Sequence, residues 1–352
     1  MDNGLYNNRR SISTFSDCSY TGNATNGKAI TNDGNSDLQP DWVWIKCRSD
    51  TANHNCSDSS RGATKHLAQN IAGAEETVSG ITGYNSDGFT LGTNGDSNGN
   101  NKTFVGWQWK ANGGTTANQS GNIASVSQAN TTSGFSIVTY TGNGGSGQSV
   151  NHGIGSAPEW VIVKRRNGSA DWFVYHVSLG NTKHLHLNTT AAQSTTSDWG
   201  NTTPSALAFF VNNTATCIDG ETYVAYCFAP VQGYSMFSSY TGNGGATAGP
   251  FVYLGFKPAW VMIKSSKDAN GDGWHIMDNK REKTANPTVG KLFAESTAGE
   301  NAATAIALDL LSNGFKVRAT DGGLNRDNDI YVFMAFAESP FVTSTGIPTT
   351  AR

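Results

Sequence analysis

The sequence is poor in charged residues and has no long hydrophobic run. Of its 352 residues only 14% are Asp, Glu, Lys or Arg, and the formal net charge is -3. A surface that binds nucleic acid or an anionic membrane needs a clustered excess of positive charge, so neither partner is expected. No apolar run approaches the roughly 20 residues of a membrane-spanning helix, so we expect no membrane insertion.

Cysteine is also scarce. The five cysteines are Cys18, Cys47, Cys56, Cys217 and Cys227. They do not recur at matching positions of the repeat described below, which excludes a disulfide framework built into that repeat. A bridge between Cys47 and Cys56 across one hairpin stays open. Assembly in a reducing cytoplasm is the simpler expectation.

Turn-forming residues take up much of the chain. Glycine alone accounts for 41 residues, and Asn, Ser and Thr separate short hydrophobic runs. Aromatic residues still make up 10%, which argues against a disordered chain. Many short apolar runs between turn clusters predict an all-β protein.

A two-part motif occurs three times. Tyr-Thr-Gly-Asn begins at residues 20, 140 and 240, and Pro-x-Trp-Val-x-x-Lys follows at residues 40, 158 and 258. The spacing between the two parts is 20, 18 and 18 residues, which indicates one module used three times. The recurring Trp42, Trp160 and Trp260 are most simply explained as core residues.

The repeat divides the chain into six segments. We expect an N-terminal arm at residues 1–12, modules at 13–110, 134–230 and 231–341, a polar linker at 111–133 and a C-terminal tail at 342–352. A strand is expected at 103–110, and its residues 104–109 alternate in a way that predicts one buried face. The one helix candidate is 298–311, limited to one or two turns. The other expected strands lie at 42–48, 65–68, 88–92, 135–140, 159–165, 171–176, 183–187, 207–211, 221–228, 236–240, 258–265, 273–278, 291–294, 314–318 and 329–336.

The strands named above number six in module 2 and six in module 3, and six or more short antiparallel strands per module are enough for a small two-sheet sandwich. The predicted fold is three tandem antiparallel β-sandwich modules. The modules can form a row or a ring about a pseudo-threefold axis, and the sequence leaves both arrangements open.

The repeated segments resemble a module of unknown function in virion proteins of tailed bacteriophages, notably phages of marine bacteria and cyanobacteria. The resemblance rests on FSIVTYTGNG, HGIGSAPEWVIVKRR and ETYVAYCFA in module 2 and on GPFVYLGFKPAWVMIK and IYVFMAFAESPF in module 3. It implies a tail-fibre, tail-associated or surface-exposed structural protein of the virion that is made in the host cytoplasm. A role as a head decoration protein is the alternative within this class.

Two groups of residues could hold a metal ion. Asp268, Asn270 and Asp272 match the first half of a calcium loop, but Asn279 stands where the loop needs a bidentate glutamate. His184 and His186 share one face of an expected strand, which suits chelation. A polar turn and a structural pair of histidines are the competing explanations, and we expect no metal and no cofactor.

Tryptophans near expected hairpin tips offer a different kind of site. Trp172, Trp199 and Trp274 could stack on sugar rings or grip a partner. These residues are the basis of a second hypothesis, a lectin-like carbohydrate-binding protein that contacts host-surface polysaccharide. No paired carboxylates or phosphate loop stand out, so no catalytic residue is assigned and no enzyme is expected. The leading hypothesis is a non-enzymatic virion protein whose partners are other virion subunits and which aids host attachment.

Overall fold

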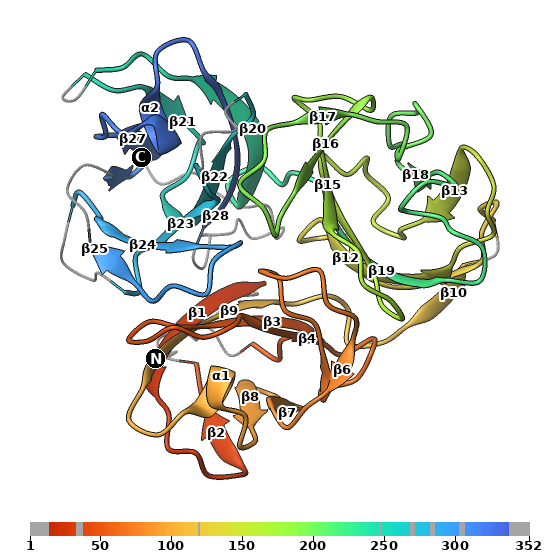
Figure 1. The fold of residues 1–352 in the computed structure, drawn as a ribbon, viewed down its shortest axis with the longest axis horizontal. Coiled ribbons are helices and arrows are strands. Elements are labelled where there is room, and N and C mark those ends of the chain that lie inside the picture. Colours follow the sequence, from red (N-terminus) through yellow and green to blue (C-terminus); the bar gives the residue numbers. More distant parts are fainter. Residues whose placement is uncertain are drawn as a thin grey trace, which may run out of the picture.

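The computed structural model describes residues 14–32, 38–118, 120–245, 248–267, 272–281, 286–302 and 307–337. Its sheets are built from short strands that pair antiparallel, so the predicted all-β class is confirmed. Figure 1 shows three lobes around a common centre. We call them lobe 1 (residues 14–110), lobe 2 (111–230) and lobe 3 (231–337). The expected arm and tail lie outside the described residues.

Lobe 1 has a main sheet and a smaller sheet that packs on one face of it. The main sheet has the order β1 (Phe15–Thr21), β9 (Thr103–Trp109), β3 (Trp42–Cys47), β4 (Asn55–Asp58). The smaller sheet has the order β2 (Lys28–Ile30), β8 (Gly88–Leu91), β7 (Ile81–Asn85). A two-stranded ribbon, β5 (Lys65–His66) with β6 (Glu76–Thr77), and the short helix α1 (Gly95–Asn98) complete the lobe.

Lobe 2 repeats this pattern with extra strands at both ends of the main sheet. Its order is β10 (Thr116–Asn118), β11 (Ser125–Asn130), β12 (Phe135–Thr141), β19 (Thr222–Phe228), β14 (Trp160–Arg165), β15 (Trp172–His176), β16 (Lys183–His186), β17 (Ser194–Thr195). The smaller sheet pairs β13 (Gln148–Asn151) with β18 (Ala208–Val211).

Lobe 3 follows the same plan. Its main sheet has the order β20 (Ser235–Thr241), β28 (Ile330–Ala337), β22 (Pro258–Ser265), β23 (His275–Asp278), β24 (Gly290–Phe293), β25 (Asn301–Ala302). The smaller sheet has the order β21 (Phe251–Tyr253), β27 (Gly314–Val317), β26 (Leu308–Leu311), and the short helix α2 (Gly322–Asn325) precedes β28.

The Tyr-Thr-Gly-Asn motif lies at the end of β1, β12 and β20, the first strand of each repeat, where its glycine approaches another loop too closely to carry a side chain. A Cβ on Gly142 would lie 2.2 Å from the carbonyl oxygen of Ile218, and one on Gly242 would lie 2.2 Å from that of Arg326. The preceding tyrosine hydroxyl donates to a backbone carbonyl, as Tyr140 does to Thr216 O at 2.7 Å. The motif therefore fastens the end of each first strand to the loop before the lobe's last strand.

One aromatic core joins the three lobes, and we call it the shared core. It includes the recurring Trp42, Trp160 and Trp260, so their prediction as core residues is confirmed. At its centre the ring of Phe336 lies 5.5 Å from Phe15 and 5.9 Å from Phe228, measured between centroids. These rings belong to lobes 3, 1 and 2 respectively. The three lobes therefore share part of their interior.

Each lobe also has a cluster of its own on the far side of its main sheet. This arrangement corrects the prediction that residues 104–109 bury one face. In β9, Val105, Trp107 and Trp109 face the shared core, whereas Phe104 belongs to the cluster of lobe 1. The central strands are buried on both faces because a packed layer lies on each side of them.

Most expected strands are confirmed, but two expectations about connecting segments are wrong. The linker at 111–133 contains β10 and β11, and β11 pairs with β12 along its whole length. The helix candidate at 298–311 contains β25 and ends in β26, with residues 303–306 outside the described part. Pairing of β26 with β27 places Leu308 in the cluster of lobe 3, and this contact outweighs a weak local helix preference.

We predict that loss of one central ring weakens all three lobes together. Phe336→Ala should lower the free energy of unfolding by about 3–5 kcal/mol, because a buried phenylalanine is replaced by a cavity. The midpoint of urea unfolding should move to a lower urea concentration. The shift should be the same whether unfolding is followed by tryptophan fluorescence or by far-UV circular dichroism. Tyr253→Ala, at a side chain that is 62% exposed, is the control and should change stability by less than about 0.5 kcal/mol. Two separate transitions in Phe336→Ala would contradict a shared core.

Candidate functional site

The chemistry of this molecule is concentrated where the lobes meet. We call the contacts of lobe 2 on lobe 1 the 2–1 joint, those of lobe 3 on lobe 2 the 3–2 joint and those of lobe 1 on lobe 3 the 1–3 joint. At each joint the lysine of the Pro-x-Trp-Val-x-x-Lys motif is buried, and its Nζ donates to a carbonyl of the neighbouring lobe. The pairs are Lys164 with Ala72 O (3.0 Å), Lys264 with Thr190 O (3.1 Å) and Lys46 with Thr297 O (3.0 Å).

These three lysines share one electrostatic environment. Burial lowers the pKa of Lys46, Lys164 and Lys264 from 10.5 to about 8. A lysine with a lowered pKa can serve as a base or a nucleophile, but each Nζ here also bonds a carbonyl of its own lobe. The amines are therefore held between backbone carbonyls and fasten the joints.

A second recurring donor lies opposite the lysine on the next strand. Trp172 Nε1 donates to Ala68 O at 3.1 Å across the 2–1 joint, and Trp274 Nε1 donates to His186 O at 2.9 Å across the 3–2 joint. His54 takes this position in lobe 1, where its Nε2 lies 3.0 Å from Phe293 O. Each joint therefore has one lysine and one ring nitrogen directed at the neighbouring backbone.

The expectation that tryptophans near hairpin tips contact saccharide is wrong for these side chains. Trp172 and Trp274 are fully buried in the shared core. Trp199 is 2% exposed in the cluster of lobe 2, and its Nε1 donates to Lys183 O at 2.9 Å. Trp172 and Trp274 stand at matching positions of two repeats, and such recurrence in the sequence favours a structural role.

Two of the joints contain a buried ionic network. In the 2–1 joint Arg61 bonds Asp58 and Glu75, and Arg166 of lobe 2 bonds the same glutamate at 2.9 Å. In the 1–3 joint the equivalent network is Asp278, Arg281, Glu300 and Arg48 of lobe 1. Each buried aspartate also accepts a hydrogen bond from the neighbouring lobe. Tyr226 Oη donates to Asp58 at 2.7 Å, and Trp107 Nε1 donates to Asp278 at 3.0 Å.

The 3–2 joint has no such network among the described residues, although it keeps the equivalent backbone hydrogen bond between the lobes. Gln193 N–H donates to Ser266 O at 2.9 Å, as Glu75 does to Arg166 O and Glu300 does to Arg48 O. His176 stands in the place of the buried aspartates, opposite Trp160 in the strand register. Burial lowers its pKa to about 4, so it is neutral near pH 7. The four residues in this joint that replace the charged set are His176, Leu179, Gln193 and Ser266.

His184 and His186, candidates for a metal site that was not expected to form, lie side by side on β16 with ring centroids 4.5 Å apart. Each faces a different carboxylate. His184 Nδ1 lies 2.6 Å from Asp198 Oδ2, and His186 Nδ1 lies 3.6 Å from Asp171 Oδ2. In the described part of the chain, no group of three or more His, Cys, Asp or Glu side chains could hold a metal ion.

Of the three calcium-loop candidates the structure describes only Asp272. Asp268 and Asn270 lie outside the described residues. The carboxylate of Asp272 accepts from Arg326 at 3.2 Å, and its backbone carbonyl accepts from Lys264 at 2.7 Å. Both oxygen types of Asp272 are therefore engaged by the fold.

The five cysteines are buried, and none of them forms a disulfide bond. The strand register places Cys56 opposite Trp44, so a hairpin bridge from Cys47 to Cys56 does not form. Burial raises the pKa of Cys56 to about 12, which keeps it a thiol.

One serine-nucleophile pattern, Gly-x-Ser-x-Gly, occurs at residues 95–99. Ser97 lies within α1 and is buried, and its Oγ donates to Asn94 O at 3.3 Å. The hydroxyl is therefore bonded to the turn before the helix and faces into the fold.

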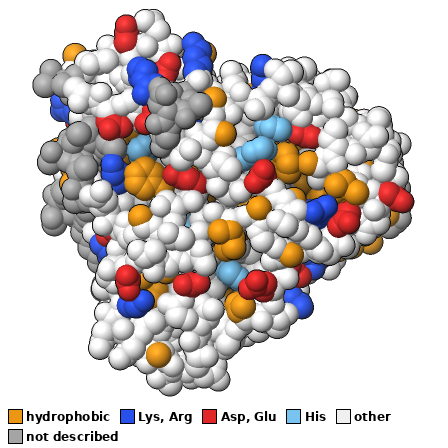
Figure 2. Space-filling view, in the orientation of Figure 1, with side chains coloured by type: hydrophobic (Ala, Val, Ile, Leu, Met, Phe, Trp, Pro, Cys, Tyr) orange, Lys and Arg blue, Asp and Glu red, His pale blue; other side chains and the backbone are white. Residues whose placement is uncertain are grey.

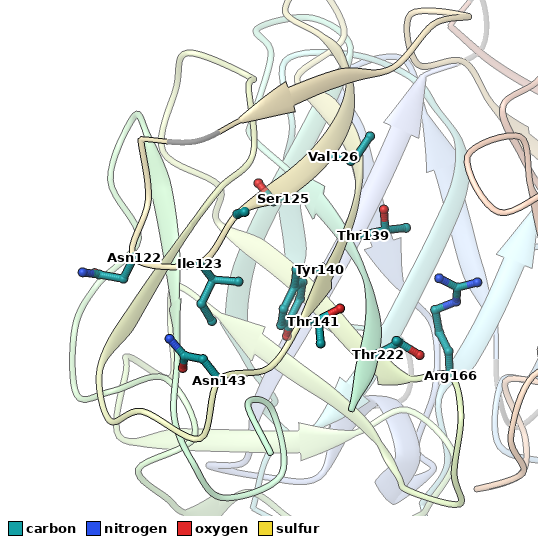
Figure 3. Close-up of a pocket in the computed structure, with 11 residues that line it drawn as sticks. Asn122, Ile123, Ser125, Val126, Thr139, Tyr140, Thr141, Asn143, Arg166 and Thr222 are labelled. Carbon is teal, nitrogen blue, oxygen red and sulfur yellow. The ribbon is translucent and has the colours of Figure 1, made fainter. Parts of the chain in front are cut away.

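An open groove of about 450 Å³ lies on lobe 2, between the start of β11, the end of β12 and the start of β19. Figure 3 shows Asn122 at one end of it and Arg166 at the other. Most of its polar side chains already have partners: Arg166 pairs with Glu75, Asn122 with Ser149 and Ser125 with Asn151 O. The groove offers mainly threonine hydroxyls, which suits weak polar contact.

We predict that the charged and neutral joints respond differently to the same substitution. Glu300→Ala should lower the free energy of unfolding by about 3 kcal/mol, because it leaves a buried arginine without one of its two carboxylates. Gln193→Ala, at the matching position of the 3–2 joint, is the control and should cost less than about 1 kcal/mol, because the backbone bond to Ser266 is kept. Chemical denaturation measures both values, and equal losses would contradict the assigned role of the network.

None of the helices in the described part of the chain is long and apolar enough to cross a membrane. No curated protein and no solved structure gives a significant match to the chain. One family model does match, and it spans residues 11–340. The chain therefore belongs to the family described as a domain of unknown function, DUF7483.

Proposed function

We propose that this chain is a non-enzymatic structural protein on the surface of a tailed-phage virion, in a tail fibre or a tail-associated part. One observation carries the proposal: the recurring lysines, tryptophans and ionic groups make contacts between lobes. Lys164 and Trp172, for example, both donate to backbone carbonyls of lobe 1. A molecule whose conspicuous polar groups hold it together is suited to be a rigid building unit. The resemblance of its repeats to virion modules supports the same proposal.

The finer architecture follows from the equivalence of the joints. We infer that each repeat is a small two-sheet sandwich and that the three repeats pack about a pseudo-threefold axis. Such a chain has the form of a trimer made from one polypeptide. It can match a threefold position on a particle and present three similar sets of loops. Many copies on one virion would turn weak loop contacts with a host surface into tight attachment.

The surface is consistent with a role in packing against other subunits. Figure 2 shows charged side chains of both signs scattered over one face, with most of that face formed by other side chains and backbone. Other virion proteins are the proposed partners, and a head decoration protein is the alternative location.

Location on the particle tests the proposal. We predict that antibodies against the chain label purified virions, and that cryo-electron microscopy density at the tail fits the three-lobed shape. Density on the head would favour the decoration alternative. A stable monomer that is absent from purified particles would contradict both.

One observation still supports the carbohydrate-binding hypothesis, although its three tryptophans are buried. Phe251 and Tyr253 are 47% and 62% exposed and project from the same face of β21, at the end of its sheet. Exposed aromatic rings two residues apart can stack on successive sugars. This hypothesis predicts binding on a glycan array that drops at least about tenfold in Tyr253→Ala. No binding to any glycan would contradict it and would leave the structural role unaffected.

A further inference from the structure

The main sheets of lobes 2 and 3 differ at one edge. In lobe 2, β11 pairs with the outer edge of the first strand, β12. Its Gln128 points into the 2–1 joint, where Nε2 donates to Asp41 Oδ1 at 2.7 Å and Oε1 accepts from Ser60 at 2.8 Å. The long connection between lobes 1 and 2 supplies this strand.

In lobe 3 the equivalent first strand is β20, and it is the end of its sheet. Residues 231–233 make the connection from lobe 2 and form a tight turn, with Ser235 N–H donating to Val231 O at 2.9 Å. No strand among the described residues pairs with the outer edge of β20. An unpaired edge strand is a template for a further strand.

The ladder shows which groups of β20 face outward. Gly242 N–H donates to Asp329 O, and Ala337 N–H donates to Tyr234 O, both at 2.8 Å. In an antiparallel ladder alternate residues bond the same neighbour, so the even-numbered residues face β28. The backbone groups of Phe237, Ser239 and Thr241 therefore point away from it.

Residues of lobe 2 lie next to the outer edge of β20. Residues of lobe 1 lie next to the outer edge of β12 in the same way. The Phe237 ring of β20 lies 6.4 Å from that of Trp160. Glu159 takes the place of Asp41: its N–H donates to Phe228 O as that of Asp41 donates to Trp109 O. Val177 likewise takes the place of Ser59, since each donates its N–H to the acidic residue's carbonyl.

Glu159 differs from Asp41 in having no side-chain partner among the described residues. Asp41 accepts from Gln128 and Ser59, whereas burial alone acts on the Glu159 carboxyl and raises its pKa. The neighbouring Val177 is 39% exposed. An unpaired carboxylate beside an exposed aliphatic side chain suits a lysine, whose stem packs on Val177 while its ammonium reaches Glu159.

We propose that the outer edge of β20 binds an extended segment of a partner polypeptide as an added antiparallel strand, with a lysine of that segment paired to Glu159. The chain contains its own precedent, because β11 occupies the corresponding edge in lobe 2. Backbone bonds to β20 supply binding, and the lysine sets the register. The inference concerns this surface alone and stands apart from the virion proposal.

A peptide experiment on the full chain tests it. The probes are synthetic peptides of residues 123–131, which contain β11, carrying either Q128K or Q128E. We expect the Q128K peptide to bind at least about tenfold more tightly than the Q128E peptide in titrations followed by NMR, because unlike charges replace like ones beside Glu159. In the Glu159→Lys variant the preference should reverse.

Two further variants separate the edge from general effects. Ser239→Pro removes an outward N–H without removing a bond to β28, so it should abolish binding while circular dichroism stays native. Glu221→Lys reverses a carboxylate at the opposite end of β19 and should leave binding unchanged. Binding that survives Ser239→Pro, a preference that does not reverse in Glu159→Lys, or no binding of the Q128K peptide at millimolar concentration would overturn the proposal.

Discussion

The shared aromatic core is the constraint on which the rest of the structure depends. Phe336 contacts rings of all three lobes, among them Trp109 and Trp260, and the recurring Trp42 and Trp160 belong to the same core. A main sheet that has this core on one side and a cluster of its own lobe on the other must be apolar on both faces. This explains why the closing strands read as TFVGWQW, TYVAYCF and IYVFMAF, and why a chain with so few charges still folds into a single body.

Polar contacts at the rim of this core decide how the lobes are oriented. Each lobe directs one lysine and one ring nitrogen at the backbone of the next, in the same sense around the centre. The 2–1 and 1–3 joints contain the whole ionic network, and in the 3–2 joint all four of its positions carry other residues. Where His176 replaces a buried aspartate, the partner position carries Met334 in place of the hydrogen-bond donor Tyr226 or Trp107. Substituting every member together avoids an unpaired buried charge.

The strands that the sequence predicts are present, because the module repeats and its apolar runs are short, but others are missed, among them β1 and β4 of the main sheet of lobe 1. Sequence reasoning also places Trp42, Trp160 and Trp260 in the core. It fails where the outcome depends on a neighbouring lobe. Residues 125–130 are polar and look like a linker, yet they form β11 because the open edge of β12 and Asp41 of lobe 1 provide their partners. Trp172 and Trp274 lie near expected hairpin tips, where a side chain would be open to a ligand, but the adjacent lobe covers them. The bare edge of β20 could not be found without knowing that β11 is a strand.

Native-state hydrogen exchange tests the central claim most directly. If the shared core makes the three lobes one cooperative unit, amides in the middle of β9, β19 and β28 should exchange through the same global opening. Their opening free energies and denaturant dependences should then be equal. A lower opening free energy confined to the strand of one lobe would contradict the account, because it would show that this lobe unfolds while the other two remain intact.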